Sequence, residues 1–285
     1  MDNSHLIEGC EALVSLTGEW LSRAATVDWR PAYGSKGEQD FFKLVLLAIV
    51  VKQHESLQVI LALDKNAEGF SAVPLLRAMC EELIWVRYLA TVKTEERASI
   101  ISALASVGLF ETFTAQEGYG VPNLDFGQGW KEQAEASSAA SAVALRIIFR
   151  AQGFQLRNNA TAPSVWQLAK KADMESTYKL LYHATSRAVH FSVPELSRRI
   201  WGRPGSMKVS SQTFERYWAA FLLYWGGWIY SLTFIESLLI LQEPEIADET
   251  VIALQEAALK IKSRGAIPIL TAEEVYWPDT WSPNV

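Results

Sequence analysis

Apolar side chains recur at every third or fourth position through most of the chain, which is the spacing that places them on one face of an α-helix. The first such segment covers residues 4–25. Later segments predict helices at residues 39–66, 71–92, 94–118, 130–149, 175–191, 214–236 and 248–263, and a short helix capped by Ser164. The pattern therefore predicts an all-α fold, a bundle of roughly eight to ten helices.

Two segments leave the organisation of this bundle open. Residues 43–51 are rich in β-branched side chains, so a strand is the alternative to a helix there. Residues 119–129 are dense in Gly, Pro and Asn, which favours a loop or a domain boundary. We expect a single helical domain over residues 1–285, with a subdivision into residues 1–118 and 128–285 as the alternative.

One segment is apolar enough to be tested as a membrane span. Residues 217–235 contain no charged residue, and about 20 apolar residues suffice to cross a bilayer. Its aromatic side chains recur through the middle of the segment, whereas membrane helices concentrate Trp and Tyr near their two ends. Gly226 and Gly227 would let neighbouring helices approach closely. We therefore predict a central aromatic helix, buried in a soluble bundle, and no contact with a membrane.

Composition fits a soluble protein with a large core. Of the 285 residues, 49% are apolar, and the formal net charge of -6 argues against a surface that attracts nucleic acid over its whole extent. Cys10 and Cys80, the two cysteines, both lie in apolar-periodic segments, as reduced and buried thiols do. The first ten residues lack the features of a signal peptide. We expect a cytoplasmic protein.

The motifs of several common chemistries are absent from the sequence. Neither GxGxxG nor GxxxxGK[ST] occurs, so the glycine-rich loops that bind dinucleotides and nucleoside triphosphates are missing. There is no HExxH motif and no GxSxG nucleophile elbow, and the four histidines are scattered. We expect no metal and no cofactor.

One predicted helix carries a file of polar residues on an otherwise apolar face. Tyr182, Ser186 and His190 are spaced four apart, so they project from the same side of the helix. Buried polar groups need partners, and Arg77 and Glu81, also four apart on another helix, are the candidates. The sequence predicts that these five residues meet in a buried cluster. The cluster either fixes the register of two helices or forms a catalytic site with His190 as acid or base.

A basic segment follows this file. Between residues 187 and 208 the charged residues are five basic ones and the single acid Glu195. An exposed basic patch attracts phosphate, and a nearby aromatic ring can stack on a base; the alternative is a solvated helix end. The candidate phosphate- or RNA-binding residues are Arg187, Arg198, Arg199, Arg203, Lys208 and Trp201.

The segments LLRAMCEELIWVRYL and YHATSRAVHFS resemble the paired motifs of an uncharacterised bacterial family of helical proteins of unknown function. In that family an Arg-xxx-Glu helix follows an sA..LLR start, and a Tyr-xxx-Ser-xxx-His helix comes later. The resemblance covers residues 41–201. It implies an all-helical fold and a shared polar cluster, and it brings no established activity.

A weaker similarity is to the HEPN superfamily of helical ribonucleases and nucleotide-transferring toxins, which act without metal. Those proteins use an Arg that is followed four to six residues later by a His. In this chain Arg187 stands only three residues before His190, and no other Arg lies at the required distance from a His. The sequence therefore departs from the motif that carries catalysis in that superfamily.

Two classes of function follow from these observations. The first is a binding or interaction module, in which the polar cluster fixes helix register and the aromatic helix supplies a homo-oligomer or partner interface. The alternative is a metal-independent, HEPN-like ribonuclease or nucleotide-directed effector of bacterial stress or phage-defence type. In that enzyme His190 would act as acid or base, Arg77 or Arg187 would stabilise phosphate charge, and Glu81 would orient them. Exposure of His190 discriminates between the two.

Overall fold

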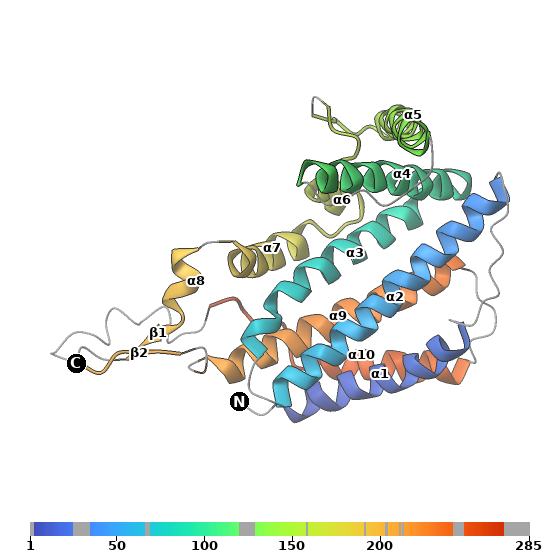
Figure 1. Ribbon diagram of the computed structural model, residues 1–285. Coiled ribbons are helices and arrows are strands. Elements are labelled where there is room, and N and C mark those ends of the chain that lie inside the picture. The colour runs from blue at the N-terminus through green and yellow to red at the C-terminus, as the bar shows by residue number, and fades with distance from the viewer. Residues whose placement is uncertain are drawn as a thin grey trace. The chain divides into compact units, whose positions relative to one another are not determined.

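Helices account for nearly all of the regular structure, which confirms the predicted all-α bundle of eight to ten helices (Figure 1). The computed structural model describes residues 3–24, 35–65, 69–119, 129–157, 159–190, 192–202, 205–210, 212, 214–241 and 248–270. In chain order the elements are α1 (Ser4–Ala24), α2 (Ser35–Lys65), the 3₁₀ turn η1 (Gly69–Ala72), α3 (Val73–Thr91), α4 (Thr94–Gly118), α5 (Trp130–Ala151), α6 (Val165–Lys171), α7 (Glu175–Val189), α8 (Val193–Ser197), β1 (Ile200–Trp201), β2 (Lys208–Val209), α9 (Glu215–Leu241) and α10 (Asp248–Lys262). Residues 43–51 are helical within α2, so the strand alternative is wrong.

The chain divides into two compact units. Unit 1 comprises Met1–Val27, Leu47–Arg87 and Met174–Val285, and unit 2 comprises Asp28–Leu46 and Tyr88–Asp173. Helices α2 and α3 each run from one unit into the other along the chain. Residues 120–128, the main part of the predicted boundary, lie outside the described residues.

Helix α9 forms the core of unit 1. It packs against α1, α10 and η1. A Cβ added at Gly226 would meet Ile60 of α2, and one added at Gly227 would meet Ile261 of α10. The two glycines thus let different neighbours approach the α9 backbone, as the sequence predicts.

Among the described residues, three helices are long and apolar enough to cross a membrane by length and composition, namely Gly37–Asp64, Thr94–Gly118 and Glu215–Leu241. In α9, 83% of the most apolar window is buried within the chain, against 33% and 28% in the other two helices. The prediction of a central buried aromatic helix is therefore confirmed. Trp218, Phe221 and Trp225 are covered by the chain itself, and the expectation that this helix supplies a homo-oligomer or partner interface stays a prediction.

A polar contact ties three helices together inside unit 1. Nδ1 of His54 in α2 lies 3.2 Å from Oγ1 of Thr17 in α1 and 3.2 Å from the hydroxyl of Tyr230 in α9. The Thr17 hydroxyl also donates to the carbonyl of Leu13 at 2.6 Å. Burial lowers the pKa of His54 by more than the neighbouring Glu55 raises it. His54 therefore favours the neutral form in the folded chain.

Unit 2 is built on the hairpin of α4 and α5, which pack along each other. Next to the hairpin, the Phe149 ring lies 6.2 Å from that of Tyr88 and 5.8 Å from that of Phe154. The Tyr88 hydroxyl donates to the Gln152 side chain, whose amide donates to Glu96 Oε2 at 2.8 Å. These contacts join the turn after α5 to α3 and α4.

Helix α6 begins with a capping box. The Ser164 hydroxyl accepts the backbone N–H of Gln167, and the Gln167 side chain accepts the backbone N–H of Ser164 at 3.0 Å. This confirms Ser164 as the cap that the sequence indicates. The two contacts satisfy backbone donors that the first turn of a helix leaves unpaired.

We predict that His54 makes the stability of the chain fall in mild acid. Because the pKa of folded His54 lies below its ordinary value of 6.5, the unfolded chain binds the proton more readily, so the free energy of unfolding falls as the pH drops through that value. His54→Gln removes the titrating group and should remove this part of the decline. Urea unfolding of both proteins at about pH 7.5 and about pH 5.5 measures the difference. Equal declines in the two proteins would contradict the prediction.

The close approach at Gly227 gives a second prediction. In Gly227→Ala the new Cβ would lie 2.6 Å from Ile261 Cδ1 and 2.8 Å from Cys10 Sγ. Overpacking of about 1–3 kcal/mol opposes a gain in helix propensity of about 1 kcal/mol, so we expect a net loss of up to about 2 kcal/mol. Gly108→Ala in α4 is the control, since nothing lies within 4 Å of its new Cβ. It should stabilise the chain by up to about 1 kcal/mol. Denaturant unfolding that gives both variants the same sign would contradict this account.

Candidate functional site

Arg77 of α3 joins the segments that the sequence pairs. Its Nε donates to Glu81 Oε1 at 3.1 Å, one helical turn later. Its Nη1 lies 3.3 Å from Nε2 of His190, and its guanidinium carbon lies 5.2 Å from the centre of the Tyr182 ring. The structure thus brings four of the five predicted residues together. Within the described part of the chain, no hydrogen bond links the hydroxyl of the fifth, Ser186, to the other four.

The cluster lies at the surface, which corrects the expectation of a buried one. The Tyr182 side chain is 38% exposed, His190 is exposed, and the side chains of Arg77 and Glu81 are 28% and 33% exposed. The physical reason is that only one face of α7, centred on Leu181, is covered. The predicted file runs along the edge of that face.

His190 also leaves the helix before the file is complete. Helix α7 ends at Val189, and His190 caps it in an extended conformation with φ −108° and ψ 160°. Its backbone N–H donates to the Ser186 carbonyl at 3.0 Å. The side chain therefore points where the cap directs it, toward Arg77, and does not continue the helical file.

The contact with Arg77 involves Nε2 of the His190 ring. A guanidinium carries only donors, so a hydrogen bond in this contact requires Nε2 of His190 to accept, which corresponds to the tautomer with its proton on Nδ1. An Nε2 atom that accepts from Arg77 is not free to take a proton from a substrate. The observed geometry thus presents His190 as an oriented acceptor and Nδ1–H donor, and not as an available base.

The hollow at the polar cluster is too small for a ligand. It measures about 10 Å³ and is lined by Arg77, Cys80, Glu81, Tyr178, Leu181, Tyr182 and Thr185. That volume holds about one water molecule. Burial raises the pKa of the Cys80 thiol to about 12, so this thiol stays protonated and is not a nucleophile. In the described ranges no three His, Cys, Asp or Glu side chains come together closely enough to hold a metal ion.

A larger hollow lies on the other side of His190. It measures about 300 Å³, at the lower end of the range for small-molecule sites. It is formed by η1, the start of α3, the end of α7, and α8 with the turn after it. Its lining residues are Phe70, Ser71, Pro74, Arg187, Ala188, His190, Ser192, Leu196 and Arg199. Among the residues whose side chains the structure describes, the lining therefore holds two arginines, one histidine and two serines, and no carboxylate.

The predicted basic residues separate into two groups. Arg187 is exposed, and Arg199, whose guanidinium lies 4.2 Å over the Phe70 ring, lines the hollow with it. Arg198 is 8% exposed; it donates to the carbonyl of Ile269 at 3.0 Å and lies 5.0 Å over the Trp218 ring. Arg198 is thus a structural residue that fixes the segment after α8 on α9.

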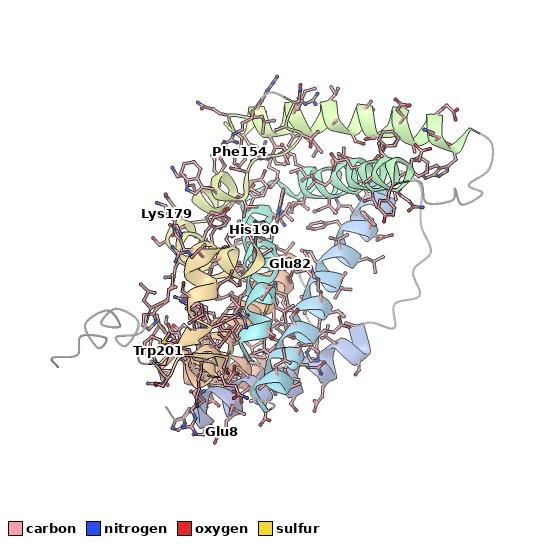
Figure 2. All side chains as sticks on the ribbon, turned by 60° about the vertical axis from the view of Figure 1, so that its left-hand side comes forward. Glu8, Glu82, Phe154, Lys179, His190 and Trp201 are labelled. Atoms are coloured by element: carbon pink, nitrogen blue, oxygen red, sulfur yellow. The ribbon has the colours of Figure 1, made fainter. Side chains whose placement is uncertain are left out.

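Trp201 and Lys208 are not among the residues that line this hollow. Trp201 and Lys208 face each other across the short antiparallel ribbon of β1 and β2, and Figure 2 labels Trp201 and His190 as separate positions in unit 1. The Trp201 ring packs edge-on against Phe214 at 5.0 Å. Arg203 lies outside the described residues.

Sequence reasoning missed the part of the hollow that comes from η1. The sequence predicts a helix from residue 71, but α3 begins at Val73 and Ser71 is an exposed residue of η1. Phe70 and Ser192 carry no motif. Ser192 lies within the basic segment, whereas only the fold brings Phe70 next to that segment.

One comparison with known proteins identifies the family. Residues 43–207 match the model of a family of unknown function, DUF5677. The chain belongs to this family. The match covers more than half of the chain, and it contains both segments on which the resemblance was predicted, so that prediction is confirmed. The similarity to the HEPN superfamily stays a prediction.

No protein with a curated description matches the DUF5677 chain, and no solved structure matches it either. The description of this family names no activity. Its function is therefore argued from the geometry of the site.

The two kinds of arginine should respond differently to truncation. Arg198→Ala removes a largely buried, charge-assisted hydrogen bond and a cation–π contact, so the free energy of unfolding should fall by about 2–4 kcal/mol. Arg187→Ala removes an exposed side chain and should change it by no more than about 0.5 kcal/mol. Denaturant unfolding of the two variants beside the parent protein checks this. Equal losses would show that the assignment of Arg198 as structural and Arg187 as available is wrong.

Proposed function

We propose that this DUF5677 protein binds the phosphate of RNA or of a nucleotide in the 300 Å³ hollow beside His190. One observation carries the proposal: the described side chains that line this single opening include two arginines, a histidine and two serines, and none of them is a carboxylate. Anions seek such local positive potential even on a protein whose net charge is -6.

Arg187 and Arg199 supply the charge. Arg187 is exposed at the end of α7 and pairs with no carboxylate among the described residues. A guanidinium binds phosphate oxygens with two parallel hydrogen bonds, which suits it to this role better than an ammonium. The Phe70 ring beneath Arg199 restricts the orientation of that side chain before a ligand arrives.

His190 and the polar cluster support the same role. Glu81 holds Arg77, and Arg77 holds Nε2 of His190, so the imidazole that lines the hollow is oriented from behind. With Nε2 engaged, Nδ1–H is the donor that the ring retains for a ligand oxygen. The cluster is in this proposal a support for the binding site, which is why its own 10 Å³ hollow needs no ligand.

RNA cleavage receives less support than binding. An Nε2 atom that accepts from Arg77 would have to lose that contact before His190 could act as a base.

The cytoplasmic location is part of the binding proposal, since Cys10 and Cys80 are free, buried thiols. A homo-oligomer stays a prediction without an assigned interface, because α9 is covered.

The test compares two variants of α7 that remove the same charge. Binding of fluorescein-labelled oligouridylate is followed by anisotropy with Arg187→Gln and with Lys179→Gln. Arg187 lines the hollow, whereas Lys179 is 60% exposed on the same helix and pairs with Glu175. We expect Arg187→Gln to weaken binding about five- to tenfold and to reduce the slope of log K against log salt by about 0.7–1. Lys179→Gln should change the affinity by less than about twofold.

Two outcomes would contradict the proposal. Equal losses in the two variants would show that only the general charge of α7 matters. Shortening of the oligouridylate by the parent protein, abolished in His190→Ala, would replace binding by cleavage.

A further inference from the structure

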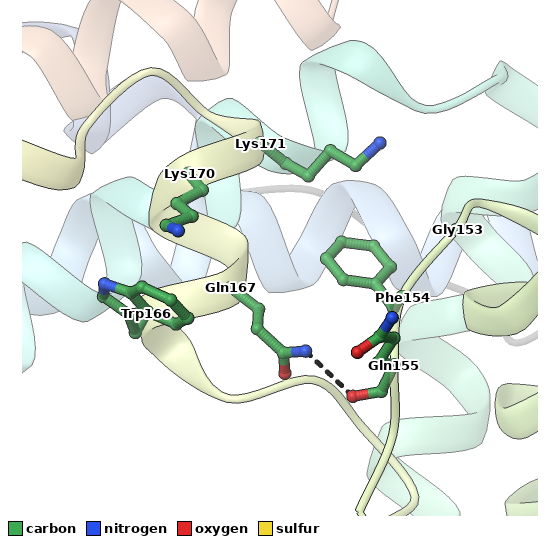
Figure 3. Close-up of a pocket in the computed structure, with 7 residues that line it drawn as sticks. All are labelled: Gly153, Phe154, Gln155, Trp166, Gln167, Lys170 and Lys171. Carbon is green, nitrogen blue, oxygen red and sulfur yellow. Dashed lines mark hydrogen bonds between the residues drawn. The ribbon is translucent and has the colours of Figure 1, made fainter.

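Unit 2 contains a second hollow with no residue in common with the first. It measures about 320 Å³ and is lined by Gly153, Phe154, Gln155, Trp166, Gln167, Lys170 and Lys171. Figure 3 shows the Trp166 and Phe154 rings on opposite sides of the hollow, with the two lysines of α6 along one edge. We propose that this hollow binds a nucleotide, with the base against the Trp166 indole and the phosphate on Lys170 and Lys171.

The charge of the hollow selects an anion. Among the described residues, its lining carries two ammonium groups and no carboxylate. In that part of the chain neither lysine forms an ion pair, and both lie near rings: Lys170 Nζ is 3.8 Å from the centre of the Trp166 ring, and Lys171 Nζ is 5.7 Å from that of Phe154. An aromatic ring orients an ammonium group without neutralising it. A phosphate can therefore take both charges without first separating an ion pair.

The aromatic walls select a ligand with a planar group. Trp166 is 40% exposed, which is unusual for so large an apolar side chain. A bare phosphate would leave the indole in water, and an uncharged nucleoside would leave the lysines without a partner. A nucleotide satisfies both, because aromatic side chains stack on bases and lysines bind phosphate.

The frame of the hollow is held in place without a ligand. The Gln167 side chain closes the capping box of α6, and its Nε2 donates to the Gln155 carbonyl at 2.9 Å, the contact drawn in Figure 3. Gly153 has φ +85°, a conformation that places Phe154 against Phe149 in the core of the unit. Lys170 is the one part that has to move, since its ammonium lies over the indole face that a base would use.

This inference does not rest on the proposed function, and photolabelling by position separates the two. The full chain is irradiated with 8-azido-AMP, digested with trypsin and mapped by mass spectrometry. We expect label on the peptide 158–170, which contains Trp166. Label on the segment after Lys179 would instead report the hollow beside His190, so either site can fail alone.

Variants and competitors then test the chemistry. Trp166→Ala should reduce labelling of peptide 158–170 at least fivefold. Lys170→Gln removes the trypsin site after residue 170, so its labelling is read on peptide 158–171 and should fall by the same factor. Lys131→Gln is the matched control: Lys131 also lies over a ring in unit 2, that of Phe113, but it pairs with Glu117 and lies outside the hollow. It should label as the parent protein does. The melting temperature of every variant is compared with that of the parent protein, which shows whether a loss of labelling comes from a loss of fold.

AMP should compete at concentrations at least tenfold lower than adenosine or inorganic phosphate do. Octauridylate and UMP are then compared as competitors. If octauridylate competes more strongly than UMP, the site binds a strand; if the two compete equally, it binds a free nucleotide. Both results support the proposal. Three results would overturn the proposal. Adenosine could compete as well as AMP does, a peptide that contains aspartate and phenylalanine could compete better than AMP, or Lys170→Gln could be labelled as fully as the parent protein.

Discussion

Burial of α9 is the constraint on which the rest of unit 1 depends. The helix carries no charge from residue 217 to residue 235, so it has to be covered along most of its length. Gly226 and Gly227 allow that cover to come close from the sides of α2 and α10. The carboxylate of Glu215 at the start of α9 accepts the backbone N–H of Gly69, which attaches η1 to the same helix. The elements around α9 thus lie where they cover its apolar side chains.

The hollow beside His190 is connected to this core by aromatic rings. The Trp218 ring of α9 packs edge-on against Phe70 of η1 at 5.3 Å, and Arg198 lies over Trp218 while Arg199 lies over Phe70. Neighbouring arginines therefore use neighbouring rings, one in the interior and one at the rim of the hollow. The buried Phe70 ring therefore restricts the orientation of the Arg199 guanidinium at the rim of the hollow.

The sequence predicts the helices well and the exposure of the site poorly, for one physical reason. Apolar spacing reports which face of a helix is covered, so α7 and α9 are predicted correctly, and a shared need for partners correctly pairs Arg77 with His190 across 113 positions. Spacing does not report how far the cover extends. The file on α7 therefore appears buried from the sequence, although Tyr182 lies beyond the covered edge. It also cannot tell Arg198 from Arg199, because the turn after α8 decides which of them points inward.

The two hollows share one arrangement of charge, which explains how an acidic chain can keep sites for anions. In each, a cation lies over an aromatic ring, Arg199 over Phe70 and Lys170 over Trp166, and no carboxylate lines the space. Lys131 shows the alternative, since it lies over Phe113 but is paired with Glu117 at 2.7 Å. An ion pair orients a cation and cancels its field, whereas a ring orients it and leaves the field for a ligand. In both proposals, the phosphate is received where an aromatic ring lies against a cation and the described lining holds no carboxylate.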